Sequence, residues 1–246
     1  MLDKLPLQSN KLATVNWRTL FVLDACRWDY FAQVTESISF PGDKEPINSE
    51  VSNTLAWYKK YWDQQNDDTV LITAHPVPEM FKRRFCKTVI TACEVDPDYT
   101  WCYPEPTIRV AIREMEKMPT KKFLVHLIPP HLPFIAGHGK KWQNECRNRW
   151  TKRADSTKDI YGEATQYGKN YNWETLVRYY KENIMLAIYK IEKYFSDYIY
   201  PVVITSDHGE MIGEHYRKKN GLSCGRRYGH IGNHPILKIV PWVYIV

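Results

Sequence analysis

Four short apolar runs along the chain have the length and composition of buried β-strands. They are Leu20–Leu23, Val70–Thr73, Phe123–Leu127 and Val202–Thr205, and polar or turn residues follow each of them. Runs of this length bounded by turn signals are typical of strands that are covered on both faces. A further run, Lys238–Val246, predicts one more strand.

Helical periodicity occupies the segments between these runs. Apolar residues recur at helical spacing in Thr54–Gln65, Thr107–Lys117 and Trp173–Tyr198, of which the last is the longest. Strands that alternate with helices are typical of α/β proteins, in which a mostly parallel sheet is covered by helices. We therefore expect an α/β fold with a mostly parallel central sheet.

The length of 246 residues fits one domain, and we expect residues 1–246 to form it. One polar segment, Gly137–Asn172, differs from the rest in composition. Within it, Lys140–Lys158 holds seven basic residues against two acidic ones. This segment is predicted to be either a basic insertion or lid beside the active site, or a solvated surface excursion.

Composition and charge narrow the class of protein only a little. The hydrophobic fraction of 43% is that of a globular chain, and the net charge of +6 suits an anionic substrate or partner. No stretch approaches 18 apolar residues, and residues 1–10 lack the apolar run of a signal peptide. We therefore expect no transmembrane segment and a cytoplasmic location, with an extracellular form as the open alternative.

The six cysteines do not form a C-x-x-C pair, which disfavours a structural zinc knuckle. We expect free thiols, as is usual in the cytosol.

Polar residues with metal-binding side chains stand where three of the predicted strands end. Asp24 ends the first strand, His126 and His131 close the third, and Asp207 and His208 end the fourth. Parallel sheets place ligands at the carboxyl ends of their strands. A carboxylate at the end of a buried strand needs compensation, which a divalent cation supplies. Because neighbouring residues of an extended chain point to opposite sides, Asp207 and His208 could serve two different metals.

A lone Asp in this position is most often a helix N-cap, and a lone His is most often a satisfied polar residue. The run Asp207–Glu210, followed by Tyr228–His230, favours a metal site over these structural roles. Carboxylate and imidazole ligands clustered at strand ends are typical of a metal site.

Five sequence blocks in a fixed order resemble the alkaline phosphatase and sulfatase superfamily, in particular its short archaeal sulfatase-like members. The resemblance implies a three-layer, alkaline-phosphatase-like sandwich. The blocks are Val22–Asp29, Ser52–Trp57, Val125–Phe134, Thr205–Glu214, and Tyr228–His230 leading to Val240–Trp242.

The resemblance implies a role for each matching residue. Asp24 would bind one metal and share it with Asp207, His208 or both. His230 would bind the other metal or complete the same one. His131 would be a further ligand, or a donor to the anionic oxygens of the substrate.

His126 is a second candidate for the role of His131. We favour the alternative that His126 is a structural strand residue whose side chain faces the packing of the sheet. His215 and His234 flank the site in sequence and rank below His230.

The family's attacking residue stands at the start of a helix, where the helix dipole favours an oxyanion. Ser52 and Thr54 both precede the helix expected from about Leu55, and either could instead be only an N-cap. We favour Thr54, because its spacing to Trp57 matches the family's pattern, and expect it to contact a metal. Metal coordination would lower the pKa of the hydroxyl.

The chain also departs from the family. It has no Cys/Ser-x-Pro-x-Arg stretch, which sulfatases need to mature a formylglycine, so phosphate esters are expected before sulfate esters. Cys26 is expected to be a small packed residue. Arg27 is a candidate for substrate contact, because a guanidinium matches phosphate oxygens bidentately, but pairing with Asp29 is equally open.

The leading hypothesis is a metal-dependent hydrolase or transferase acting on a phosphate ester, or less favourably a sulfate ester, of an anionic small molecule, glycan or lipid. Two divalent cations are expected, zinc first, with manganese, calcium or magnesium as alternatives. The competing hypothesis is a catalytically inactive protein of the same fold that binds an anionic glycan or a protein partner. Nucleic-acid binding is not expected, and the oligomeric state stays open.

Overall fold

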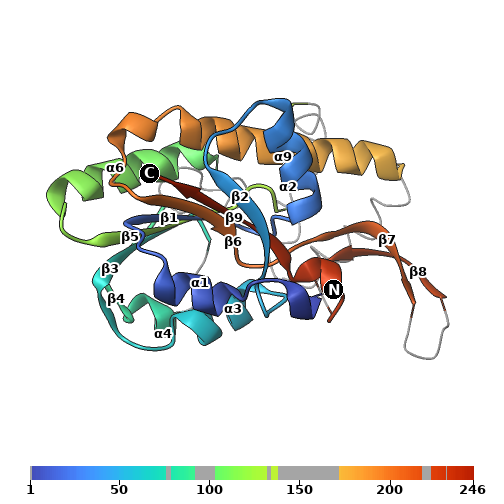
Figure 1. Ribbon diagram of the computed structural model, residues 1–246, viewed down its shortest axis with the longest axis horizontal. Helices are drawn as coiled ribbons and strands as arrows, with labels where there is room; N and C mark the ends of the chain where they lie inside the picture. The colour runs from blue at the N-terminus through green and yellow to red at the C-terminus, as the bar shows by residue number, and fades with distance from the viewer. Residues whose placement is uncertain are drawn as a thin grey trace, which may run out of the picture.

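The computed structural model describes residues 2–75, 79–91, 103–131, 134–137, 172–217, 223–230 and 232–246. Within these ranges a seven-stranded sheet has the strand order β2-β9-β6-β1-β5-β3-β4 (Figure 1). Its strands are β1 (Thr19–Leu23), β2 (Asp43–Asn48), β3 (Asn66–Thr73), β4 (Phe85–Ile90), β5 (Lys122–Leu127), β6 (Val202–Ser206) and β9 (Ile239–Ile245).

The sheet is mostly parallel, as the sequence predicts. Strand β1 pairs in parallel with both β5 and β6, and β3 pairs in parallel with β4 and β5. Strand β9 runs antiparallel to its neighbours β2 and β6. All five predicted strands form, whereas β2 and β4 were not predicted. These two strands lie at the sheet edges and carry exposed polar residues, so they lack the continuous apolar run of a central strand.

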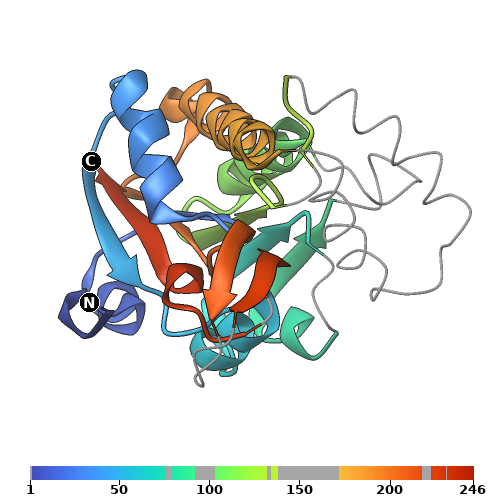
Figure 2. The ribbon, with the colours of Figure 1, turned by 90° about the vertical axis from the view of Figure 1, so that its right-hand side faces the viewer.

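Helices cover both faces of the sheet and give the three-layer sandwich (Figures 1 and 2). One layer holds α2 (Trp28–Ser37), α6 (Pro104–Lys117) and α9 (Trp173–Glu192). The other holds α1 (Gln8–Thr14), α3 (Thr54–Tyr61) and α4 (Glu79–Lys82). Short 3-10 helices are η1 (Leu2–Lys4), η2 (Phe195–Asp197) and η3 (Pro235–Leu237).

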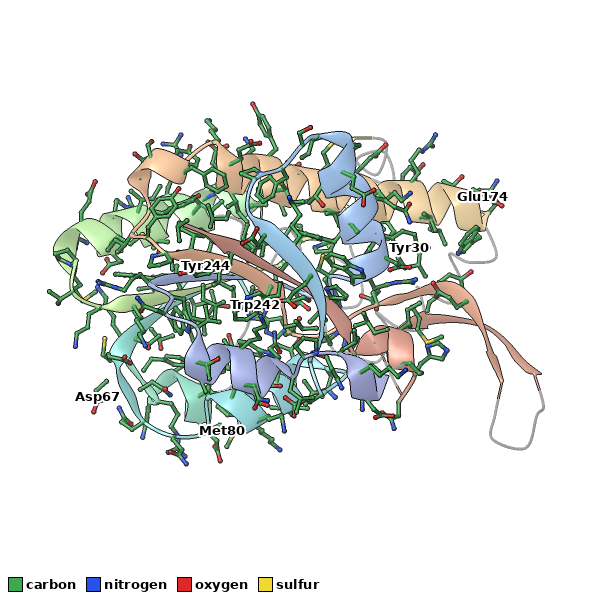
Figure 3. The ribbon with its side chains drawn as sticks, viewed as in Figure 1. Tyr30, Asp67, Met80, Glu174, Trp242 and Tyr244 are labelled. Atoms are coloured by element: carbon green, nitrogen blue, oxygen red, sulfur yellow. The ribbon has the colours of Figure 1, made fainter. Side chains whose placement is uncertain are left out.

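The alternation of side chains along β1 divides the core into two clusters. Phe21 and Leu23 pack toward the α2, α6 and α9 layer, whereas Leu20 and Val22 pack toward α3 on the opposite face. Side chains fill both layers (Figure 3). Because β1 is buried on both faces, the residue that follows it emerges from the middle of the sheet.

The predicted helices differ from the structure mainly at their ends. The helix expected to start near Leu55 begins at Thr54, because Asn53 caps it by accepting a hydrogen bond from the Ala56 amide. The helix expected to reach Tyr198 ends at Glu192, and η2 follows it. Such shifts of a few residues are usual, because the ends of a helix depend on its capping contacts.

A two-stranded hairpin of β7 (Met211–Arg217) and β8 (Ser223–Gly229) follows the central strand β6 and extends away from the sheet (Figure 1). This hairpin was not predicted. The expected basic lid lies outside the described residues apart from its ends, Gly137 and Asn172, and stays a prediction. Among the described helices, none is long and apolar enough to cross a membrane.

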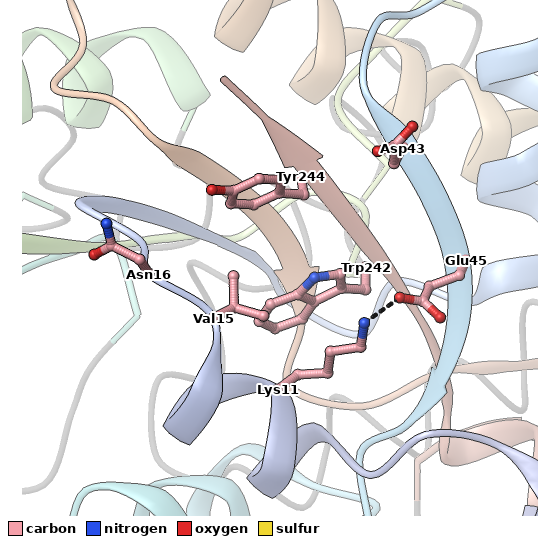
Figure 4. Close-up of a pocket in the computed structure, with 7 residues that line it drawn as sticks. All are labelled: Lys11, Val15, Asn16, Asp43, Glu45, Trp242 and Tyr244. Atoms are coloured by element: carbon pink, nitrogen blue, oxygen red, sulfur yellow. Dashed lines mark hydrogen bonds and ion pairs between the residues drawn. The ribbon is translucent and has the colours of Figure 1, made fainter.

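A groove of about 360 Å³ lies where α1 packs beside β2 and β9 (Figure 4). Lys11 of α1 forms an ion pair with Glu45 of β2 across this groove, above Trp242. The contact ties the N-terminal helix to the edge of the sheet.

Candidate active site

Three neighbouring strands bring the predicted metal-binding residues to one edge of the sheet. β6, β1 and β5 are adjacent, with Leu23 beside Ser206 and Val22 beside His126. Asp24 and Asp207 follow directly after β1 and β6. Their proximity is fixed by a hydrogen bond of 3.0 Å from the Ala25 amide to Asp207 Oδ1.

The turn after β1 is strained and closely held. Ala25 has a φ of 59°, a left-handed conformation that costs a residue with a Cβ about 1 kcal/mol or more. The Tyr180 hydroxyl donates to the Ala25 carbonyl at 2.5 Å. The Asp24 amide donates to Leu127, and the His131 amide donates to the Asp24 carbonyl, both at 3.0 Å. These bonds lock Asp24 and His131 to the same turn.

His208 lies between the two aspartates. Its Nε2 is 3.3 Å from Asp207 Oδ2 and 3.6 Å from Asp24 Oδ1, and Thr54 Oγ1 lies 3.2 Å away. Its Nδ1 is 2.8 Å from the Gly209 carbonyl, which can only accept a hydrogen bond, so Nδ1 carries the proton in the neutral ring. The lone pair on Nε2 therefore points toward two carboxylates and the Thr54 hydroxyl.

A second group of side chains adjoins the first. Glu210 lies between His131 and His230, with Oε2 3.6 Å from His131 Nε2 and Oε1 3.4 Å from His230 Nδ1. The rings of His208 and His230 have centroids only 4.3 Å apart, so the two groups share one pocket wall. Two sets have ligand atoms close enough together to hold a cation, namely Asp24, His126 and Asp207, and His131, Glu210 and His230.

Several of these polar atoms are buried without a hydrogen-bond partner among the described residues. They are Asp24 Oδ1, His126 Nε2, Asp207 Oδ2 and both carboxylate oxygens of Glu210. An unpaired buried carboxylate is costly, and native proteins satisfy nearly all such groups. Five such atoms lie close together here, and their carboxylate and imidazole donors fit the binding of divalent cations.

The protonation states agree with this donor set. Burial raises the pKa of Asp207, but the charges of His208 and His126 outweigh it and hold the pKa at about 2. Burial lowers the pKa of His208 to about 4. Burial, with the charges of Asp207 and Glu210, raises the pKa of Asp24 well above its usual value. Asp207 and His208 are therefore in the deprotonated forms that bind a metal. A bound cation would relieve the repulsion that raises the pKa of Asp24.

Comparisons with solved structures agree on one fold. The soluble domain of lipooligosaccharide phosphoethanolamine transferase A from Neisseria meningitidis matches with a TM-score of 0.53 at 14% identity, over 92% of this chain and 75% of that one. The C-terminal periplasmic domain of phosphoethanolamine transferase EptC from Campylobacter jejuni matches with a TM-score of 0.51 at 12% identity, over 98% and 82%. The corresponding Escherichia coli domain, solved in complex with zinc, matches with a TM-score of 0.51 at 11% identity, over 95% and 74%.

This chain has the alkaline phosphatase and sulfatase fold. The neighbours share the fold that the resemblance of the sequence blocks implies, whereas the archaeal part of that resemblance has no support. No protein-family model matches the chain, and no curated protein matches it.

The comparisons contradict the expected cytoplasmic location of this sulfatase-like protein. Two of the neighbours are described as C-terminal periplasmic domains, and a third as the soluble domain of a lipooligosaccharide phosphoethanolamine transferase. The expected cytoplasmic location rests only on the absence of a recognisable apolar leader or span, and the periplasmic neighbours overturn it.

Of the two expected nucleophiles, the sulfatase-like fold brings Thr54 to the site and leaves Ser52 outside it. Thr54 is buried at the first position of α3, beside His208. The Ser52 hydroxyl donates to the Gly232 carbonyl at 2.9 Å in an exposed position. Ser52 therefore holds two loops together, and the predicted alternative of Ser52 as nucleophile does not fit this geometry.

Arg27 is committed to carboxylates of the protein itself. Its Nε and Nη2 donate to both oxygens of Asp29 at 3.0 and 2.6 Å, and Nη1 pairs with Glu214 and donates to the Glu210 carbonyl. The structure thus adopts the pairing with Asp29 that the sequence left open, and the fork that substrate contact requires is occupied. Cys26 is fully buried, and burial raises the pKa of its thiol, as expected of a packed residue.

Two residues of the site, Glu210 and His75, are not among the ligands that the sequence predicts. Glu210 stood inside the recognised Asp207–Glu210 run, where its spacing to His208 was the available signal. His75 follows β3, and its Nε2 lies 3.8 Å from Asp24 Oδ2. His126 was expected to face sheet packing, yet its ring lies beside Asp207. His234 caps η3, and the side chain of His215 lies outside the described residues.

Proposed function

We propose that this chain is a metal-dependent transferase or hydrolase of phosphate esters, with the Thr54 hydroxyl as nucleophile. One observation carries the proposal: the buried Thr54 hydroxyl lies 3.2 Å from His208 Nε2, next to Asp24 and Asp207, each of which has one buried carboxylate oxygen without a hydrogen-bond partner among the described residues. The similarity in fold to phosphoethanolamine transferases supports the same reaction class.

The residues that would hold the cations fall into the two groups of the site. Asp24, Asp207 and His208 would hold one ion beside Thr54, and His131, Glu210 and His230 would hold the other. When bound, divalent cations supply positive charge that lowers the pKa of a hydroxyl and stabilises the charge developing on phosphoryl oxygens. Zinc is the preferred metal, because imidazole and carboxylate donors are combined.

The side chains then divide the reaction between them. Thr54 Oγ1 forms a bond to phosphorus while the ester P–O bond breaks, and the departing oxygen takes up a proton. An acceptor alcohol or water then attacks the phosphorylated Thr54 and restores its hydroxyl. The first-turn position of Thr54 in α3 places the positive end of the helix dipole next to the transferred group.

The substrate class follows from the same chemistry. We propose a phosphate ester on an anionic lipid or glycan, handled outside the cytoplasm, since the neighbours modify lipooligosaccharide or are periplasmic domains. Phosphate is preferred over sulfate, because the sequence has no formylglycine motif. Transfer and hydrolysis differ only in the acceptor that resolves the phosphorylated Thr54.

The test is turnover of aryl phosphate monoesters, aryl phosphate diesters and an aryl sulfate by the purified protein, before and after chelation and after return of zinc. We expect phosphate-ester cleavage that is lost with chelator and restored by metal, with little on the sulfate. Addition of an alcohol acceptor would report transfer as a transesterified product. Metal-independent turnover, or none on any phosphate ester, would overturn the proposal.

A further inference from the structure

A buried imidazole that the sequence offers only as a second candidate for the role of His131 faces the same carboxylates. His126 on β5 is fully buried, and its Nε2 lies 4.0 Å from Asp207 Oδ2. That distance is too long for a hydrogen bond. Neither atom has a hydrogen-bond partner among the described residues.

A hydrogen bond on the far side of the ring fixes how His126 is oriented. The Tyr58 hydroxyl of α3 lies 3.0 Å from His126 Nδ1. Because this contact occupies Nδ1, Nε2 is the ring nitrogen that faces the carboxylates.

His126 Nε2 and Asp207 Oδ2 are therefore two buried polar atoms that face each other without a hydrogen bond among the described residues. Such unsatisfied atoms are costly inside a protein, and a cation bound by both would satisfy them. A metal-binding histidine typically donates its other ring N–H to a neighbouring acceptor, and the Tyr58 hydroxyl would be that acceptor for His126 Nδ1.

We infer that His126 is a ligand of the cation held by Asp24, Asp207 and His208, and that this fourth donor makes the site select zinc. The inference rests on the proposed metal centre and extends it. Two carboxylates and two imidazoles match the four-coordinate sites that zinc prefers, whereas manganese, magnesium and calcium favour oxygen ligands.

The distances suit such a set. In a tetrahedral zinc site with bonds of about 2.0–2.1 Å, neighbouring ligand atoms are roughly 3.3 Å apart. The N···O separations are 3.3 and 3.6 Å for His208 and 4.0 Å for His126. Movements of a few tenths of an ångström by His126 and Asp24 toward a bound ion would bring the longer separations close to that value.

His75 positions the ring of His126. The two imidazoles stack with an interplanar angle of 8° and centroids 5.6 Å apart, and His75 Nε2 reaches the other oxygen of Asp24 at 3.8 Å. Its backbone is held by a 2.9 Å bond from the His75 amide to Thr73 Oγ1. The stack leaves His126 little freedom to turn away from the carboxylates.

The experiment compares zinc, manganese and cobalt binding to the wild-type protein with binding to H126N and Y58F, by competition with a chromophoric chelator. Asn keeps a donor toward Tyr58 but has no atom at Nε2. We expect H126N to lose about 100-fold or more in zinc affinity and less than about tenfold in manganese affinity. We expect Y58F, which removes only the outer acceptor, to lose about 10- to 100-fold in zinc affinity.

Y61F is the matched control, because the Tyr61 hydroxyl on the same helix bonds Ser49 and Glu50 instead of the site. It should bind zinc like the wild type. The absorption of bound cobalt gives a second measurement: strong visible bands of a low-coordinate ion in the wild type should weaken in H126N. Circular dichroism and melting curves establish that each variant is folded.

The outcomes separate this inference from the proposed function. Unchanged zinc affinity and an unchanged cobalt spectrum in folded H126N would overturn the inference alone. A wild-type protein that binds neither zinc nor cobalt would overturn the inference and the proposed metal centre together. Loss of zinc binding in H126N, in a wild type without phosphate-ester turnover, would support the inference while the proposed reaction fails.

Discussion

Removal of the Thr54 hydroxyl should abolish cleavage of the phosphate ester while the rest of the site stays in place. Thr54→Val keeps the shape of the side chain but removes the nucleophile, so we expect kcat on an aryl phosphate ester to fall by about 10³-fold or more. Thr54→Ser keeps a hydroxyl in the same place and should retain measurable turnover. Steady-state kinetics with a saturating aryl ester measures both.

Ser52→Ala provides the comparison from the same segment. Its hydroxyl bonds Gly232 at the surface, so turnover should stay within about twofold of the wild type. A collapse of activity in Ser52→Ala, with Thr54→Val still active, would show that the nucleophile has been assigned to the wrong residue.

Gly209 is the second residue with a sharp expectation. A Cβ placed there would lie 2.5 Å from the Ile236 carbonyl oxygen and 3.1 Å from Arg27 Cγ. Because the nearest atom is backbone, relief requires a shift of η3 or of the segment that carries His208 and Glu210. We expect Gly209→Ala to lower the free energy of unfolding by about 1–3 kcal/mol, measured by urea denaturation. Wild-type stability in this variant would mean that the two segments are not packed this closely.

At the scale of elements, Glu105 joins α6 to the end of α9. It accepts hydrogen bonds from Lys190 at 2.5 Å, Tyr194 at 2.6 Å and Lys193 at 3.1 Å. These bonds lower the pKa of the Glu105 carboxyl below its usual value. Since the folded pKa lies below the unfolded one, the stabilisation is full above the unfolded pKa of about 4.3 and is lost as the pH falls below it.

Glu105→Gln should therefore be less stable than the wild type by about 1 kcal/mol near neutral pH, and the gap should narrow in acid. Denaturant unfolding over a range of pH measures the gap. Glu116→Gln, an exposed change on the same helix, should be as stable as the wild type both near neutral pH and in acid. A gap that stays constant down to strongly acidic pH would exclude an electrostatic origin.

The elements also show what the sequence could predict. Central strands such as β1 and β6 were found because burial on both faces leaves an unbroken apolar run. β2 was missed because an edge strand of the sequence Asp43–Asn48 carries polar residues and a proline. In the site, Asp207 and His208 are neighbours in one sequence motif, so the sequence alone predicts that they belong to the site.

The sequence does not predict His75 as a site residue, and it offers His126 only as a second candidate at the end of a strand. Their rings meet only because β3 and β5 are neighbours, with Thr73 beside His126 in the register. The approach of His126 Nε2 to Asp207 Oδ2 likewise depends on strand order, because His126 lies on β5 and Asp207 follows β6, and both strands flank β1. Contacts of this kind arise from strand pairing, which periodicity and spacing do not reveal.

At the scale of the whole molecule, cation binding should contribute to folding stability. Asp24, Asp207 and Glu210 lie buried and close together, so the folded metal-free chain carries their mutual repulsion. A ligand that binds only the folded state at about 100 times its Kd adds roughly 2.7 kcal/mol. For a chain of this size that corresponds to a rise in Tm of about 5–10 °C.

The measurement is a melting curve of the chelated protein before and after addition of zinc. Asp207→Asn should show a smaller zinc-induced rise in Tm than the wild type, because it removes a carboxylate from one of the two proposed sites. A chelated wild-type protein whose Tm does not respond to zinc would contradict the expected linkage.

The position of β9 also has a consequence for how the chain acquires its structure during synthesis. Among the described residues, β2 pairs along its length only with β9, where Asp43 lies opposite Tyr244, apart from one bridge to Leu7. At about 5–20 residues per second, a ribosome needs roughly 10–40 s to make the intervening chain. For that time β2 is a nascent strand with open edges. Its charged residues Lys44 and Glu45, and the missing N–H of Pro46, are the features that keep such an edge from pairing with another chain.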